Sequence, residues 1–328
     1  GKLMKKVLFA TTALVATAGV AAADVTFGGY GRFGILYSSA AGPDGLAQTF
    51  GDDGTGDSST DLTYRFRLQL DATAESDTGV VFGARVRIEQ ENDEVDDAAN
   101  SGTGINAPRF FARSGGLEVG VGNIYGAIEA MPGMYPIDLG LTGLEYQYSP
   151  YQYGADFYDS DGAGASAGSA GTGAPFQNAV EVMYSFGDLS VHVSASEGAR
   201  DRVAAHVAYT WSGWTFALGG QDSNSATDTE WLASAGGSLG AVDVSLAYAD
   251  NGANGDQWTL AGRYDVSAAT DIEFYVSDAE TYSGNPTSNN SYGIDFNHDL
   301  GGGTSLRGGV AKLFQGHTVA DMGVRFNF

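Results

Sequence analysis

The stretch TVADMGVRFNF, residues 318–328, shows a pattern that recurs through most of the chain. Every second residue back from Phe328 is apolar, and the residues between them are mostly polar or small. Successive side chains of a β-strand point to opposite faces, so this segment has one apolar face and one polar face. A soluble edge strand usually blocks further pairing with charge or proline. An apolar outer face, a polar inner face and pairing onto the first strand are instead what a closed transmembrane β-barrel requires.

The N-terminal residues predict a secretory signal peptide. Lys5 and Lys6 precede an apolar run at residues 7–20, and three alanines at residues 21–23 follow as a cleavage site. A membrane anchor is the alternative, but the apolar run is short for a spanning helix. We therefore expect a leader at residues 1–23, with residues 1–3 as upstream additions before Met4, and a single barrel domain at residues 24–328.

The composition excludes several classes of protein. The chain has no cysteine, which removes disulfides and thiol chemistry. Its net charge is −24, and it falls to about −27 once the three lysines of the leader are removed. Nucleic acid is therefore excluded as a partner, because binding phosphates requires basic patches. With 43% hydrophobic residues and 17 each of Tyr and Phe, the chain is also too apolar and aromatic to be disordered.

The same alternation recurs in about sixteen segments, and long and short connections between them alternate. The long connections include residues 38–60, 91–107 and 125–177, and the short ones include residues 75–79, 114–116 and 187–188. Outer-membrane barrels have long loops outside and short periplasmic turns. The predicted strands lie at residues 25–37, 62–71, 80–89, 109–113, 117–124, 180–186, 189–195, 203–211, 214–221, 231–236, 242–249, 258–266, 272–277, 292–299, 305–314 and 318–328.

The parity of the arginines favours a water-filled lumen. Each arginine within a predicted strand falls on the polar face. On the apolar face it would contact lipid, at a cost of about 2–4 kcal/mol near the bilayer midplane. A soluble β-sandwich or lectin-like domain is the alternative, but it explains neither the leader nor the alternation of long and short connections. The arginines are Arg32, Arg65, Arg67, Arg85, Arg87, Arg109, Arg113, Arg263, Arg307 and Arg325.

Three segments give the chain a resemblance to a known family. They are DVTFGGYGRFGILY at residues 24–37, DTGVVFGARVR at residues 77–87, and the stretch at residues 318–328. In them the chain resembles the general diffusion porins of Gram-negative outer membranes, of the sixteen-stranded alphaproteobacterial type. The resemblance implies a homotrimer among outer-membrane lipid and lipopolysaccharide that passes small hydrophilic solutes. It also implies that the third long loop folds into the lumen and narrows it.

The expected constriction has a basic and an acidic side. Five arginines of the first three strands, Arg32, Arg65, Arg67, Arg85 and Arg87, lie near mid-height and would form one basic wall. The long connection contributes Glu129, Asp138 and Glu145, which would face that wall if the connection folds inward. Alternatively, the arginines neutralise lumen acids such as Asp71 and Glu89. Because acids far outnumber arginines, we expect a weak preference for cations.

Other chemistry has little support in the sequence. Asp156, Asp159 and Asp161 could attract Ca²⁺, but the bidentate glutamate of an EF-hand loop is missing, so a solvated acidic loop is the favoured interpretation and no cofactor is required. Ser166 lies in a G-x-S-x-G match, but within a run of Gly, Ala and Ser where a nucleophile elbow is not expected. We therefore expect a channel and no enzyme. The alternatives are a substrate-selective outer-membrane channel, or an enzyme or adhesin on a barrel scaffold.

Overall fold

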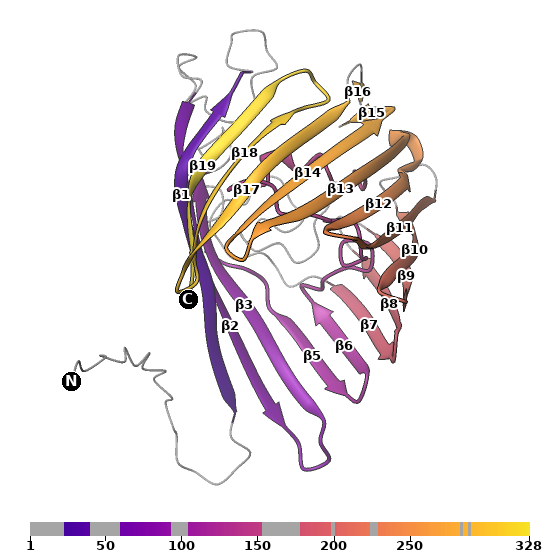
Figure 1. The fold of residues 1–328 in the computed structure, drawn as a ribbon. Helices are drawn as coiled ribbons and strands as arrows, with labels where there is room; N and C mark the ends of the chain where they lie inside the picture. Colours follow the sequence, from indigo (N-terminus) through magenta and orange to yellow (C-terminus); the bar gives the residue numbers. More distant parts are fainter. Residues whose placement is uncertain are drawn as a thin grey trace, which may run out of the picture.

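The period-two segments form antiparallel strands, each hydrogen-bonded to the next strand of one large sheet (Figure 1). The computed structural model describes residues 23–39, 60–92, 104–152, 178–197, 201–223, 229–282, 285–287 and 290–328. Sixteen strands make the barrel wall. They are β1 (Asp24–Ser38), β2 (Thr60–Glu75), β3 (Val81–Asn92), β5 (Arg109–Ser114), β6 (Leu117–Gly122), β7 (Asn178–Phe186), β8 (Leu189–Glu197), β9 (Arg202–Trp211), β10 (Trp214–Ser223), β11 (Glu230–Leu239), β12 (Val242–Asp250), β13 (Asp256–Ser267), β14 (Thr270–Ala279), β17 (Ser291–Gly301), β18 (Thr304–Lys312) and β19 (Thr318–Asn327).

The barrel closes between its first and last strands. β1 pairs with β2 on one side and with β19 on the other, in a register that runs from Tyr30 opposite Asn327 to Ser38 opposite Val319. Beyond that ladder, the Gly29 N–H donates to the Phe328 carbonyl at 2.9 Å and the Phe328 N–H donates to the Gly29 carbonyl at 3.1 Å. Closure leaves the wall without an open edge, as a membrane-spanning sheet requires. The prediction of a closed antiparallel barrel of about sixteen strands is confirmed.

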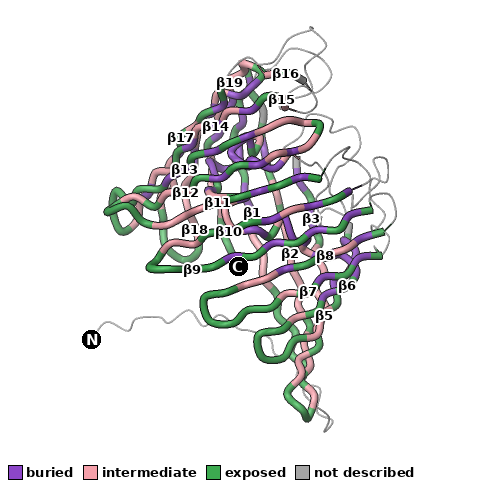
Figure 2. The backbone as a smooth tube through the Cα atoms, turned by 90° about the vertical axis from the view of Figure 1, so that its right-hand side faces the viewer, coloured by how far each residue is buried: buried purple, intermediate pink, exposed green. Residues whose placement is uncertain are grey.

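Burial alternates along the strands as the sequence predicts. In β9, Val203, Val207 and Tyr209 are exposed, whereas Ala204 and Ala208 between them are buried. Figure 2 shows this alternation as buried and exposed segments succeeding one another along the strands. Exposed aromatic residues lie near strand ends, among them Trp211, Trp231 and Trp258. An apolar outer face with aromatic girdles is the surface that a bilayer stabilises.

The connections at one end of the barrel are short turns. Glycines with positive φ serve several of them, such as Gly213 (φ 80°), which follows Ser212 (φ 50°) between β9 and β10. Two-residue hairpins need such left-handed backbone, which glycine adopts without steric cost. The predicted leader lies outside the described residues apart from Ala23, and β1 begins at Asp24.

Smaller elements lie at the opposite end and in the lumen. The two-residue strand β4 (Gly104–Ile105) pairs with β3, and β15 (Thr281–Tyr282) pairs with β16 (Asn285–Pro286). Two 3₁₀ helices, η2 (Leu144–Tyr146) and η3 (Gly252–Asn254), complete the elements of the described ranges. Within those ranges no helix is long and apolar enough to cross a membrane.

Candidate functional site

The connection after β6 folds into the barrel. Its described part, residues 123–152, is called the inner loop below. At its start, the backbone N–H of Tyr125 donates to the Glu181 carboxylate on β7 at 3.0 Å. Two residues later, the N–H of Ala127 donates to Ser194 Oγ on β8 at 2.9 Å. The loop therefore turns inward directly after β6. Polar side chains of the wall accept the hydrogen bonds of loop N–H groups that have no backbone acceptor.

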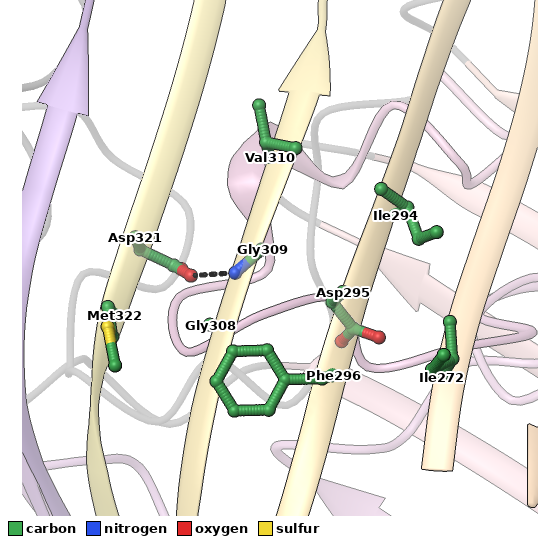
Figure 3. Close-up of a pocket in the computed structure, with 9 residues that line it drawn as sticks. All are labelled: Ile272, Ile294, Asp295, Phe296, Gly308, Gly309, Val310, Asp321 and Met322. Atoms are coloured by element: carbon green, nitrogen blue, oxygen red, sulfur yellow. Dashed lines mark hydrogen bonds between the residues drawn. The ribbon is translucent and has the colours of Figure 1, made fainter. Parts of the chain in front are cut away.

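Buried carboxylates anchor the middle of the inner loop. Asp321 on β19 accepts hydrogen bonds from the backbone N–H groups of Leu141 at 2.9 Å and Thr142 at 2.7 Å. Its other oxygen accepts the Gly309 N–H of β18 at 3.1 Å (Figure 3). On β17, Asp295 accepts the N–H of Gly140 at 2.6 Å. A charged acceptor strengthens such bonds, so these carboxylates position the loop against the wall.

The underside of the inner loop is apolar. Ile128, Met131 and Met134 are buried in a cluster with small wall residues such as Ala208 and Ala217. Small side chains on the wall leave room for the loop. Burial of the apolar groups of the loop stabilises this packing by roughly 0.8 kcal/mol for each CH₂. On the outer side of the same barrel, an apolar pocket of about 370 Å³ lies over Gly308 (Figure 3).

The five predicted basic residues lie together on the inner faces of β1, β2 and β3, here called the open wall. Each has a polar partner, on the same wall or on the inner loop. Arg65 pairs with Glu91 and Arg67 with Glu89, while Arg85 pairs with Asp71 at 2.5 Å. Arg32 lies 4.0 Å from Glu91 and donates to the Leu141 carbonyl of the inner loop at 2.9 Å, and Arg87 donates to Gln69 at 2.9 Å. The structure thus joins the arginines into one wall and also gives them the acidic neighbours of the alternative prediction.

The three predicted acidic residues lie in separate places. Glu129 pairs with Arg202 of β9 at 2.8 Å, and only 9% of its side chain is exposed. Asp138 accepts hydrogen bonds from Arg307 of β18 at 2.6 Å and Arg325 of β19 at 3.1 Å, and 57% of its side chain is exposed.

Glu145 lies in η2, on the return segment of the inner loop. Burial raises the pKa of Tyr282 in the β15–β16 hairpin, and the Glu145 carboxylate nearby adds to the rise. Of the three predicted acids, Asp138 is the one with an exposed side chain.

Comparison with known proteins identifies the family. The model of the Gram-negative porin family matches residues 10–317. The chain belongs to this family. A porin of Fuscovulum blasticum is 29% identical over 93% of this chain and 100% of its own length, and a porin of Rhodobacter capsulatus is 25% identical over the same shares. Solved structures of engineered variants of the Rhodopseudomonas blastica porin superpose with TM-scores of 0.75 and 0.76 at 26% and 27% identity. They cover 93% of this chain and 100% of theirs. This porin is therefore a non-enzymatic channel of the outer membrane.

Some lumen residues of this porin escape sequence reasoning. Arg307 and Arg325 carry the lumen parity, but nothing in the sequence places Asp138 between them. Arg202 precedes residue 203, where its strand is predicted to begin, so the sequence assigns it to a loop. The wall carboxylates that hold the loop backbone have the parity of any other lumen acid. In each case the partner is a residue of the inner loop, more than 50 positions away in the sequence.

The predicted calcium ligands Asp156, Asp159 and Asp161 lie outside the described residues, as does Ser166. Among the residues that the structure does describe, no group of three or more His, Asp or Glu side chains could hold a metal ion.

Proposed function

We propose that this porin is a general diffusion pore for small hydrophilic solutes, with a weak preference for cations, and that its constriction lies between the inner loop and the open wall. The observation that carries the proposal is the course of the inner loop. Polar groups of β7, β8, β17 and β19 hold its backbone. It meets the open wall where Arg32 donates to the Leu141 carbonyl and Arg85 to the Tyr125 hydroxyl, while Arg65 and Arg67 stay partly exposed. A loop held across a lumen sets a size limit, and charges on the two sides filter polar solutes.

The charge balance supports the preference for cations. The open-wall arginines are interleaved with Asp71, Glu89 and Glu91, so much of their charge is compensated locally. Over the whole chain 40 acidic residues exceed 16 basic ones. A lumen and mouth with excess negative charge concentrate cations.

The test is a reversal potential across a planar bilayer that separates dilute KCl solutions of different concentration. We expect the sign that corresponds to K⁺ preference. A potential of anion-selective sign would overturn the preference, and absence of conductance from correctly folded protein would overturn the diffusion pore itself.

We also propose a homotrimer, whose outward face meets outer-membrane lipid and lipopolysaccharide. The family resemblance supports it, as does the exposed apolar surface of β1 to β3, which includes Phe27, Phe33 and Phe66. The outward glycines of β1 leave no groove in this surface. The ring of Phe326 lies over Gly31, and the ring of Phe328 lies near Gly29. Light scattering in detergent should give the mass of three chains, and the mass of one chain would overturn the proposal.

The mature chain of this proposed pore begins at Asp24. The start of β1 at that residue supports it, because a barrel strand directly follows the predicted cleavage site. N-terminal sequencing of protein from the outer membrane should read Asp-Val-Thr-Phe, and a sequence that begins within the leader would refute it.

A substrate-selective channel is the second candidate. The observation in its favour is a pair of exposed tyrosines on the inner loop, Tyr135 and Tyr146. A pore that only excludes large solutes has no need of exposed aromatic rings in its lumen.

A further inference from the structure

Two tyrosines of the inner loop present their rings to the lumen. Tyr135 is 48% exposed and Tyr146 is 43% exposed, although most of their neighbours in the loop are buried. Their ring centroids lie 6.5 Å apart with an interplanar angle of 84°. The pair, here called the tyrosine lip, therefore forms a corner in which the edge of one ring meets the face of the other.

The tyrosine lip is rigidly supported. Tyr146 packs on Tyr148 with ring centroids 5.7 Å apart, and Tyr148 packs on Tyr275 of β14 at 5.6 Å. Both supporting tyrosines are buried. A Cβ atom at Gly143 would lie 2.4 Å from the Tyr146 ring, so this glycine allows the ring to lie close to the backbone.

The backbone of η2 has an unusual left-handed conformation, which places the Tyr146 ring. Leu144, Glu145 and Tyr146 have φ values of 43°, 72° and 52°, a left-handed conformation that costs L-residues about 1–2 kcal/mol each. Burial of the Leu144 side chain holds the turn in place. Residues held in such sparsely populated backbone conformations cluster at functional sites.

Hydrogen-bonding groups lie beside the tyrosine lip. Asp138 is three residues after Tyr135 and is held by the guanidinium groups of Arg307 and Arg325. The Asp138 N–H donates to the Glu273 carboxylate of β14 at 3.0 Å, two positions before Tyr275, on which Tyr148 packs. Arg325 also stacks over the Tyr30 ring at 4.2 Å. Acceptors and donors thus adjoin two aromatic surfaces, and the two carboxylates of Asp138 and Glu273 offset the charges of Arg307 and Arg325.

This combination favours one class of solute. A saccharide ring has an apolar C–H face, which fits an aromatic surface, and a rim of hydroxyls that both donate and accept hydrogen bonds. An organic cation would meet a carboxylate already shared by two guanidinium groups. A flat aromatic solute could stack on a ring face, but it has no rim of hydroxyls to use the donors and acceptors beside the rings. We propose that the tyrosine lip, with Asp138, Arg307 and Arg325, is a subsite for neutral saccharides; the inference rests on the proposed diffusion pore.

Ion-current block by a glucose trisaccharide tests the subsite in wild-type channels. We expect block that saturates with concentration, because a bound sugar occupies the lumen for a measurable time. Polyethylene glycol of matched hydrodynamic size should lower the current without saturating, since it lacks the hydroxyl rim. Conducting channels that the trisaccharide does not block saturably would overturn the subsite and leave the diffusion pore standing. Protein that gives no conductance would overturn the diffusion pore instead.

Variants locate the site. Tyr135→Leu with Tyr146→Leu should weaken half-maximal block about tenfold, whereas Phe at both positions should retain most of it because the ring faces remain. Tyr209→Leu with Tyr292→Leu, on the exposed outer surface, is the matched control and should not change the block. If the double leucine variant does not insert, Tyr135→Leu alone serves. Unchanged block in the leucine variants, or stronger saturable block by N-methylpyridinium than by the trisaccharide in wild type, would overturn the proposal.

Discussion

The two walls of the lumen use charged side chains differently. On the open wall of β1 to β3, arginines pair with neighbouring carboxylates of the same sheet, such as Arg67 with Glu89. On the wall of β7 to β19, here called the covered wall, carboxylates accept backbone N–H groups of the inner loop, as Asp321 does from Leu141 and Thr142. The first arrangement leaves guanidinium groups beside the lumen, and the second uses charge to hold a loop.

Residue size differs in the same way. The covered wall has alanines and glycines where the loop packs, such as Ala217 and Gly219, beside Met131. The open wall has long polar side chains at the corresponding inward positions. Substitutions on the covered wall should therefore act through the position of the loop, and substitutions on the open wall should act on permeating ions directly.

The largest effect is expected for Asp321→Ala on the covered wall. The change removes the acceptor of the Leu141, Thr142 and Gly309 N–H groups, and each buried donor left unsatisfied costs about 1–3 kcal/mol. The inner loop should detach, so single-channel recordings should show large current fluctuations and thermal unfolding should shift to lower temperature. Asp299→Ala, at an exposed position near the end of β17, is the control. Steady wild-type conductance in the Asp321 variant would show that the carboxylate does not hold the loop.

The next largest effect is expected on the open wall, for Arg65→Ser with Arg67→Ser. Removal of two guanidinium groups widens the lumen and takes away the Arg65 partner of Glu91 and the Arg67 partner of Glu89, so conductance and cation preference should both rise. Stability should fall as well, by about 3–5 kcal/mol, because the Glu89 and Glu91 side chains are only 2% and 9% exposed and lose charged partners. Reversal potential, conductance and thermal unfolding measure these effects.

The opposite change is Glu89→Gln with Glu91→Gln, which removes two negative charges from the same wall. It should move the ion selectivity toward anions. If the arginine variant matches wild type in both conductance and reversal potential, the open wall does not line the constriction.

A smaller effect is expected for two acidic residues of the inner loop, whose neutral variants should differ in ion selectivity. Asp138→Asn removes an exposed charge from the lumen and should shift the reversal potential toward anions. Glu129→Gln removes a mostly covered charge beside Arg202, so it should lower the unfolding temperature with little change in selectivity. Equal selectivity shifts in both variants would mean that the loop is less tightly packed than the comparison of walls requires.

The smallest effect concerns wild-type protein in salt. The cation preference measured near 0.1 M KCl should weaken in 1 M KCl, because the screening length falls from about 10 Å to about 3 Å. Reversal potentials at a fixed concentration ratio measure it. A preference that persists unchanged in molar salt would mean that ions are selected by close contact at one site. The diffuse charge of the lumen would then not be its cause.

The sequence by itself determined the barrel and the sidedness of its strands. Period-two alternation is a local property, so residues 318–328 reveal an inner and an outer face without knowledge of any partner. Short turns then bring successive strands together in register, which is why Arg65, Arg67, Arg85 and Arg87 could be placed on one wall. The two-residue strands β4, β15 and β16 escaped prediction because they are too short to show a period.

Only the tertiary structure decided the partners of the inner loop. Glu129 meets Arg202, Asp138 meets Arg307 and Arg325, and Asp321 meets the Leu141 N–H across sequence separations that no turn constrains. A long loop has many possible paths, because the entropy cost of closing it depends only weakly on its length. Its path is selected by the apolar groups it buries and the backbone N–H groups it must satisfy against a wall that exists only once the barrel has closed.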